Sequence, residues 1–432
     1  MDRSSGHRLG LGQGTALFVG AVLGPGVLAL PHLAAAAAGP SSIVAWTALL
    51  ALSVPVALTF AALGARHPDA GGVATFAARA FGPRPALVAG FCFYGVVPVG
   101  VLAGAMIGGD HVASAAGAGR PGAAGVTVAL LLAAFAANHG GLRLSGRIQL
   151  VLVAVLAALL VVATLASAPH IRADNFTPFT PHGPLGVAHA AGVLFFAFAG
   201  WEAASHLSAD FADPRRLLPR ATALTLAIVG VLYLGLAVTV TGVLGDRAAS
   251  SPVPLALLLA DGIGGAAARP VTAAAALVLS FVAMNTYIAG GARLGAALAR
   301  DGALPARLAR GSAGGQVPRR SLALLAVLTA ALCVAVLATG AGLDPLMRVT
   351  AACLATVTLI GMASATRLLP GRGRTLARAG TVFTGVVLLS CGFYLVVPAA
   401  LAAMALRRGV RTSPAPSEPD VEGPPALATP RA

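Results

Sequence analysis

Apolar segments of about 20 residues recur along the whole chain, and they restrict the fold more than any other feature of the sequence. An α-helix rises about 1.5 Å per residue and the hydrocarbon layer of a membrane is about 30 Å thick, so each segment is long enough to cross it. We count eleven segments, at residues 15–38, 42–63, 87–107, 122–138, 148–168, 186–207, 221–242, 271–299, 322–338, 346–362 and 382–406. The sequence therefore predicts an all-α polytopic membrane protein with about 11–12 transmembrane helices.

Composition agrees with this class and excludes several others. Charged residues make up only 10% of the 432 residues, which leaves too little polar surface for a soluble globule of this size. All 29 basic residues are arginine, and the absence of lysine excludes a P-loop ATPase and enzymes that form a Schiff base. The four cysteines lie in apolar segments without CxxC spacing, so we expect them to be small core residues.

The arginines are distributed unevenly between the two ends of the predicted spans. If the N-terminus is cytoplasmic, the inside segments hold nineteen arginines, from Arg3 to Arg378. The outside loops then hold Arg120, Arg172, Arg247 and Arg269. The positive-inside rule therefore predicts a multi-pass protein of the cell membrane with a cytoplasmic N-terminal tail, residues 1–14.

The C-terminal end of the chain conflicts with this orientation. Eleven spans leave Arg407 and Arg408 outside, against the same rule, so eleven or twelve helices and either side for the C-terminus stay open. Residues 409–432 are rich in proline and serine and are predicted to be disordered.

The sixth apolar segment contains a glutamate, Glu202, directly after Gly200 and Trp201. The other acidic residues, such as Asp110, fall in predicted loops, span ends or tails. A carboxylate within a span costs roughly 2.5–3.5 kcal/mol on insertion scales and usually faces a cavity on an ion or substrate pathway. We therefore expect a broken helix near Gly200, with Glu202 beside such a cavity.

The first apolar segment has an interruption of its own. Gly24, Pro25 and Gly26 lie near its middle, where the proline removes a helix hydrogen bond and exposes neighbouring backbone groups. Glycines also form close-packing faces between membrane helices, which is our interpretation of Gly20. For residues 24–26 we expect a break that lines a cavity.

The two interrupted segments are five spans apart. This spacing is typical of two five-helix inverted repeats whose unwound segments meet near the middle of the bilayer. The sequence therefore predicts a first repeat at 15–168, a second repeat at 186–366 and an additional helix at 382–406.

Four motifs, in or directly after the first, sixth and eighth segments, resemble those of a known family, the amino acid–polyamine–organocation transporters. Residues 24–31 resemble the G-x-G-V/I-x-x-x-P motif of its first helix. Residues 196–202 resemble F-A-F-x-G-[FW]-[ED] in its sixth helix, and 213–220 match the N-P-x-R-x-L-P motif that follows. Residues 299–305 resemble A-R-D-G-x-L-P, after the eighth helix. The resemblance implies the five-plus-five, leucine-transporter-like fold with discontinuous helices 1 and 6.

The same resemblance implies a secondary active amino acid transporter that works by alternating access, and not an enzyme. It points to short bacterial members that move neutral hydrophobic amino acids, including exporters of methionine and branched-chain amino acids. An exporter or exchanger of this fold is therefore the alternative to an importer.

A zwitterionic substrate needs one group of contacts for each of its two charges. Backbone N–H groups and a helix dipole suit the carboxylate, and freed carbonyl groups suit the ammonium. The expected donors are Gly24, Gly26 and Val27, and the expected acceptors are Phe198, Ala199 and Gly200. Pro25 departs from the family pattern because it has no N–H to donate. Trp201 is the candidate gate, and an anchor at the membrane interface is its alternative role.

Glu202 and His206 are the candidates for proton coupling. Burial in a low-dielectric cavity disfavours the charged form of a carboxyl group, so Glu202 can take up a proton in the working pH range of a carrier. His206 lies one helical turn further on, if the helix re-forms after the break, and can relay that proton. The alternative is that Glu202 stays ionised and caps the broken helix. The fifth span lacks the lysine that some proton-coupled relatives are described as using. The coupling ion is therefore H⁺, or Na⁺ bound by Thr286 and carbonyls near Val22 and Leu23.

Arg293 is a second charged residue within a span, near the predicted cytoplasmic end of the eighth. It is the candidate for an inner gate, through an ion pair with an acidic residue such as Asp210. A side chain that extends to the membrane surface is the alternative.

No motif of a membrane enzyme is present: the sequence has no HExxH, no GxSxG and no pair of membrane carboxylates. We therefore predict no catalytic residue, no metal site and no cofactor. The rival class is a membrane-embedded sensor, which usually carries a soluble output domain. The same lack of a soluble domain with clustered arginines argues against nucleic acid as a partner. The expected partners are the amino acid, the coupling ion and the lipid bilayer, with the oligomeric state left open.

Substrate charge can be predicted from the acidic and basic residues near the breaks. Without a second acidic residue near Glu202 the site suits arginine and polyamines poorly, and without a free cation it does not favour glutamate. We therefore expect neutral apolar side chains such as those of leucine, isoleucine, valine or methionine.

Overall fold

The computed structural model describes residues 9–67, 72–141, 146–198, 200–201, 211–263, 268–310 and 317–408. Regular structure in these residues is helical, apart from one isolated bridge between Leu9 and Phe211. The main helices are α1 Leu11–Val22, α2 Leu30–Ala38, α3 Ser42–Arg66, α5 Pro83–Ala116, α6 Gly119–His139, α7 Gly146–Ser167, α8 Gly183–Phe198, α10 Pro214–Leu244, α13 Ala268–Arg300, α14 Arg319–Thr339, α15 Leu343–Leu368, α16 Gly371–Ser390 and α17 Val396–Arg407. Shorter helices are η1 Pro25–Leu28, η2 Gly39–Ser41, α4 Gly72–Phe81, η3 Ala168–His170, η4 Ala173–Phe176, α11 Arg247–Ser250, α12 Pro254–Ile263, η6 Ala306–Ala309 and η7 Gly392–Leu395.

Within the described residues, eight helices are long and apolar enough to cross a membrane, or nine if the bent pair α16–α17 is one span. This number is lower than the eleven predicted spans. One reason is that α1 and α8 are shorter than the about 20 residues that a crossing needs. The other is that helical residues run on from α2 through η2 into α3, so 30–66 forms one candidate span. The chain is thus an all-helical, multi-pass membrane protein.

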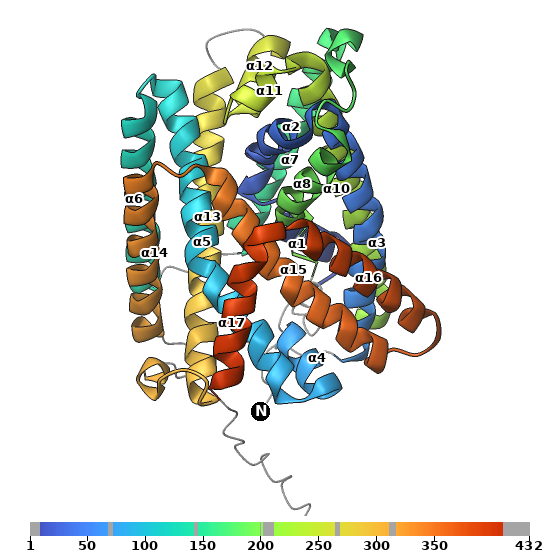
Figure 1. The fold of residues 1–432 in the computed structure, drawn as a ribbon, viewed down its shortest axis with the longest axis vertical. Helices are drawn as coiled ribbons and strands as arrows, with labels where there is room; N and C mark the ends of the chain where they lie inside the picture. The colour runs from blue at the N-terminus through green and yellow to red at the C-terminus, as the bar shows by residue number, and fades with distance from the viewer. Residues whose placement is uncertain are drawn as a thin grey trace, which may run out of the picture.

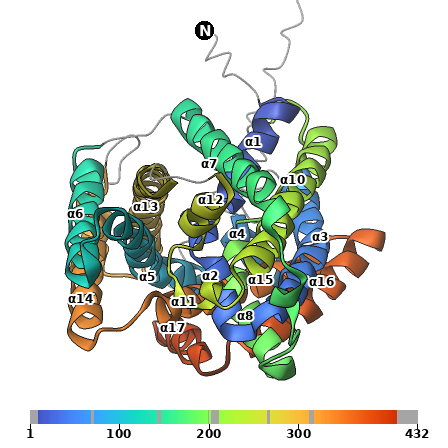
Figure 2. The same cartoon turned by 90° about the horizontal axis from the view of Figure 1, so that it is seen from above.

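The helices form two groups (Figures 1 and 2). In the first group α5 packs along α13, α6 and α14. In the second, α3 packs against α8 and α10, while α1 packs against α10 and α2 against α8. The buried helix η1, which joins α1 to α2, contacts α5 and α13 of the first group and α8 of the second. The glycine-rich segment therefore lies inside the bundle.

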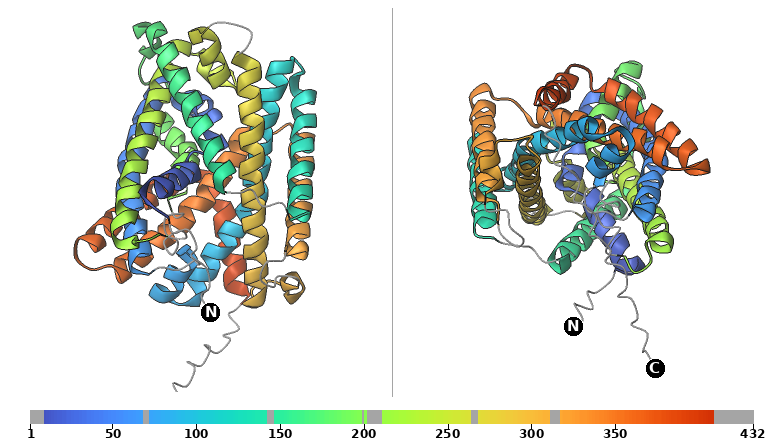
Figure 3. Two further views of the ribbon diagram at one scale, coloured as in Figure 1. Left: turned by 180° about the vertical axis from the view of Figure 1, so that it is seen from behind. Right: turned by 90° about the horizontal axis from the view of Figure 1, so that it is seen from below.

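The last predicted span, 382–406, is not a single helix. α16 and α17 are bent by 112° at a break where Gly392 has a φ of +56°. With twelve residues α17 is too short to cross a bilayer. It packs against α5 and runs toward the end of the bundle that carries α4 (Figures 1 and 3). Arg407 and Arg408 are expected outside because residues 382–406 are counted as a complete eleventh span. The bend removes that reason, since the segment does not cross the bilayer as one straight helix.

One further difference from the sequence prediction involves the end of a helix. α5 continues to Ala116, so Asp110 lies on a helix, past the predicted end of the third span. The connection between α10 and α13 forms α11 and α12, and Leu258 of α12 is fully buried. The four cysteines are buried and free, as expected for core residues.

Candidate functional site

The helix of the first predicted span is interrupted at its glycines. α1 ends at Val22, the N–H of Gly24 donates to the carbonyl of Val22 at 2.9 Å, and the chain is extended at Gly24 before η1 begins. The N–H of Val27 donates to the carbonyl of Gly24 at a longer 3.3 Å. The N–H of Gly26 has no hydrogen-bond partner among the described residues. Of the three expected donors, Gly26 is therefore the one that is available in this conformation.

The sixth predicted span is interrupted as well, directly after Phe198. Gly200 has a φ of +121°, which favours glycine, and Trp201 is only 3% exposed. The indole N–H of Trp201 is buried without a hydrogen-bond partner among the described residues. Ala199, Glu202 and His206 lie outside the described residues.

The two breaks lie side by side. A Cβ atom built on Gly200 would be 2.7 Å from the carbonyl oxygen of Ala21, so only glycine lets the two backbones approach this closely. Gly26 is also covered, since a Cβ there would be 2.5 Å from the ring of Phe196. A Cβ on Gly24 would meet no atom of the described residues within 4 Å, so open space begins at Gly24 in this part of the chain.

Tyr233 of α10 connects the ends of both interrupted helices, and the sequence analysis did not identify it. Its hydroxyl lies 3.0 Å from the carbonyl oxygen of Val22 and 3.3 Å from that of Ala197. The ring packs edge-on against Trp46 and Phe198, at 5.1 and 5.5 Å between centroids. A tyrosine in the middle of an apolar span was the available signal, because its buried hydroxyl must find a partner.

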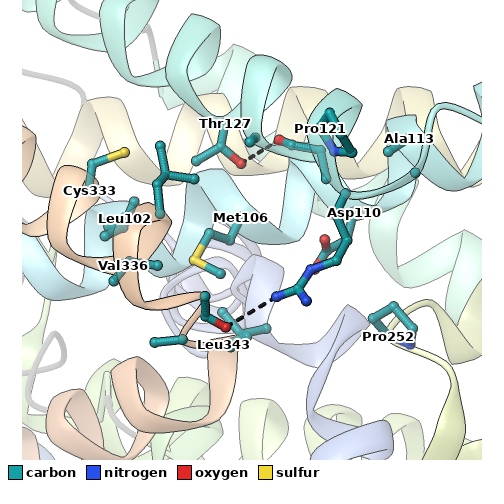
Figure 4. A pocket seen from close by; sticks show the side chains of 18 of the residues that line it. Leu102, Met106, Asp110, Ala113, Pro121, Thr127, Pro252, Cys333, Val336 and Leu343 are labelled. Atoms are coloured by element: carbon teal, nitrogen blue, oxygen red, sulfur yellow. Dashed lines mark hydrogen bonds between the residues drawn. The ribbon is translucent and has the colours of Figure 1, made fainter.

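A cavity of about 1080 Å³ lies on one side of the breaks, at the end of the bundle that carries α11 and α12. Leu102 and Met106 of α5 line it with residues of α2, α6, α14 and α15 (Figure 4). Asp110 is part of the wall, and Arg120 donates to the carbonyl of Gly340 at 3.1 Å. The wall is therefore mostly apolar, with Asp110, Arg120 and Asp344 among the residues that line it.

Comparison with known proteins identifies the family of the chain. Residues 9–412 match the amino acid permease family. The chain is 31% identical over 393 residues to the uncharacterized amino acid permease YecA of Bacillus subtilis, covering 90% of this chain and 92% of YecA. The chain belongs to the amino acid permease family. The permease is thus a transporter and not an enzyme, and this family implies the leucine-transporter-like fold.

Two further relatives have names that include substrates. The permease is 35% identical over 301 residues to the L-methionine/branched-chain amino acid exporter YjeH of Escherichia coli, covering 67% of this chain and 69% of YjeH. It is 28% identical over 334 residues to the branched-chain amino acid permease BcaP of Bacillus subtilis, covering 72% and 70%. The permease is therefore similar both to an exporter and to a protein named as a permease.

Arg293, the candidate for an inner gate, is the other charged site residue expected from the sequence. Arg293 is an exposed residue of α13, and the proposed partner Asp210 lies outside the described residues. The exposed position suits the alternative in which the side chain extends to the membrane surface. The described residues contain no group of three histidine, cysteine, aspartate or glutamate side chains that could hold a metal ion.

Proposed function

We propose that the permease is a secondary active transporter that moves neutral, hydrophobic amino acids across the cell membrane by alternating access. The observation that carries this proposal is the contact between the two interrupted helices, where Gly200 lies against Ala21 and Tyr233 links the helix ends. Interrupted membrane helices are tolerated where they line a cavity and bind a substrate.

The substrate carboxylate lies at the start of η1 in this proposal. The N–H of Gly26 is unpaired among the described residues, and Gly24 borders open space. Val27 contributes if its long bond to Gly24 opens. The ammonium group lies at the end of α8, where the carbonyls of Phe198, Ala199 and Gly200 are the acceptors. Trp201 closes the site, because its burial fits a gate better than an anchor among headgroups.

The architecture of the proposal is two inverted repeats of five helices, at 15–168 and 186–366, followed by an additional segment at 382–406. Helices 1 and 6 are the discontinuous ones. The proposal places the N-terminal tail, residues 1–14, on the cytoplasmic side; α1 begins within it at Leu11, and residues 1–8 lie outside the described part of the chain. Residues 409–432, which the sequence predicts to be disordered, also lie outside it. Support comes from the five-span spacing of the breaks and the uneven distribution of arginine.

An exporter is the second candidate for the direction of transport. The similarity to YjeH, named as an L-methionine/branched-chain amino acid exporter, favours it. Alternating access is reversible, so the gradients and the coupling ion decide the direction of net flux. The substrates expected for either direction are leucine, isoleucine, valine and methionine.

For coupling, the proposal assigns proton transfer to Glu202, with His206 as the relay. Na⁺ bound near Thr286, whose hydroxyl donates to the carbonyl of Val282 at 3.0 Å, is the alternative. For Arg293 the proposal favours a side chain that extends to the membrane surface, since its position on α13 is exposed, and keeps the inner gate as the alternative. Normal transport after Arg293→Glu would end the gate assignment.

Membrane vesicles that contain the permease test the proposal. We expect labelled leucine or methionine to enter and leave these vesicles faster than control vesicles, with saturation at high concentration. Binding of the amino acid without flux would instead identify a sensor and contradict the proposal.

A further inference from the structure

A second, smaller cavity lies at the opposite end of the bundle from the large one, where α6 ends and α14 begins. It has a volume of about 590 Å³. The residues that line it are His139, Gly140, Gly141, Arg310, Val317, Arg319 and Arg320. Four of these seven residues are basic and none is acidic, so the cavity has the chemistry of an anion site.

The arginines of this cavity have few partners within the described chain. Arg320 donates to the carbonyl of Arg307 at 3.4 Å. No carboxylate of the described residues forms an ion pair with Arg310 or Arg319, and both side chains are exposed. The first turn of α14 adds the positive end of a helix dipole, and its N-cap, Pro318, provides no side-chain cap. The positive charges of the arginines around this cavity repel each other, and a bound anion would reduce that repulsion.

Apolar surface continues from this cavity along the same two helices. α6 and α14 pack side by side at the edge of the bundle (Figure 2). Leu132 of α6 is 68% exposed, and Val327 and Val334 of α14 are 64% and 66% exposed. In a membrane protein such side chains contact acyl chains. One ligand with a phosphate group at one end and hydrocarbon chains at the other would fit both the cavity and the surface above it.

We propose that this cavity binds the phosphate headgroup of an anionic phospholipid, whose acyl chains lie along α6 and α14. Arg310 and Arg319 supply charge-assisted hydrogen bonds to the phosphate oxygens, and His139 and Arg320 complete the basic wall. Basic pockets between membrane helices are suited to phosphate headgroups of this kind. The site is independent of the substrate site at the helix breaks.

The test is native mass spectrometry of the full-length permease after exchange into equal amounts of phosphatidylglycerol and phosphatidylcholine. We expect wild type to retain phosphatidylglycerol preferentially. Arg310→Gln and Arg319→Gln should each weaken its binding about fivefold, and the double variant about 25-fold, from the typical contribution of one basic residue near an anionic surface. The matched control is the double variant Arg372→Gln/Arg378→Gln on α16, whose residues are also exposed, and it should retain wild-type binding.

Three outcomes would overturn the proposal. Equal binding of the two lipids by wild type would show that the headgroup charge is not recognised. If the double variant of Arg310 and Arg319 and the double variant of Arg372 and Arg378 lost phosphatidylglycerol binding equally, the lipid would be attracted to basic surface in general and not to this cavity. If inorganic phosphate in excess bound as tightly as phosphatidylglycerol, the site would be one for soluble phosphate and not for a lipid.

Discussion

Gly200 and Gly24 at the two breaks have different surroundings. Alanine at Gly200 therefore tests the packing of the fold, and alanine at Gly24 tests substrate binding. Gly200→Ala places a Cβ against the backbone of Ala21 at a φ of +121°, so we expect a loss of about 2 kcal/mol or more in stability. Gly24→Ala meets open space at a φ of −86° and should keep wild-type stability within about 0.5 kcal/mol.

The effect of Gly24→Ala should appear in transport and not in stability. Because the added methyl group of Gly24→Ala enters the space proposed for the substrate, its KM for leucine should rise. Thermal unfolding and labelled-leucine uptake measure both quantities. A Gly200→Ala protein as stable as wild type would contradict the close approach of the two breaks.

Tyr233 provides a second test at the scale of single residues. Tyr233→Phe keeps the ring against Trp46 and Phe198 but removes the hydroxyl that contacts the carbonyls of Val22 and Ala197. We expect a loss of about 1–2 kcal/mol in stability and a lower transport rate. Tyr394→Phe, at a position half-buried in η7, is the control and should change neither. Unchanged transport in Tyr233→Phe would mean that this hydroxyl does not hold the helix ends in place.

Glu202→Gln separates the two roles proposed for this carboxyl group. The amide keeps the shape and can accept a hydrogen bond, but it cannot carry a proton. We expect accumulation driven by a pH gradient to disappear while exchange of internal for external substrate continues. Accumulation that persists would make Glu202 a structural cap and favour coupling to Na⁺.

At the scale of helices, the junction of α3 and α4 has a predictable response to pH. His67 directly follows the last residue of α3, and burial lowers the pKa of its imidazole, with Arg79 and Arg66 lowering it further. The fold thus favours the neutral ring, and this contribution to stability is present above the unfolded pKa of about 6.5 and is lost as the pH falls through the lowered folded value.

His67→Gln removes this titration, so its melting temperature should fall less than that of wild type as the pH decreases below about 6.5. His170→Gln, at an exposed position of η3, is the control and should follow wild type. Identical pH profiles for wild type and His67→Gln would contradict the assignment to His67.

The helices also show which parts of the fold are predictable from sequence. The interruption at residues 24–26 has a local cause, since proline and glycine restrict or free the backbone where they stand. The bend between α16 and α17 has little local signal, because an apolar segment has the same composition whether it crosses the bilayer or bends back. The role of Tyr233 depends on Val22, which is 211 positions away in the sequence, and on Ala197, which is 36 positions away. No local sequence pattern contains these contacts.

At the scale of the whole molecule, a large cavity lies at one end of the bundle, two interrupted helices meet in the middle and basic residues line a smaller cavity at the other end. Class, family and the places of the breaks follow from composition and motifs. The cavity near Asp110 and the basic cavity between α6 and α14 could not be predicted, because each collects residues from several helices. Their positions depend on packing, which the order of the spans alone does not fix.

The central claim is that the permease moves neutral hydrophobic amino acids through the site at the helix breaks. Counterflow in proteoliposomes of the purified protein tests it most directly: vesicles are loaded with one unlabelled amino acid, and uptake of labelled leucine is followed. We predict transient uptake when the vesicles contain leucine, isoleucine, valine or methionine, and none when they contain arginine or glutamate. Counterflow driven only by cationic amino acids, or none with any of them, would contradict it.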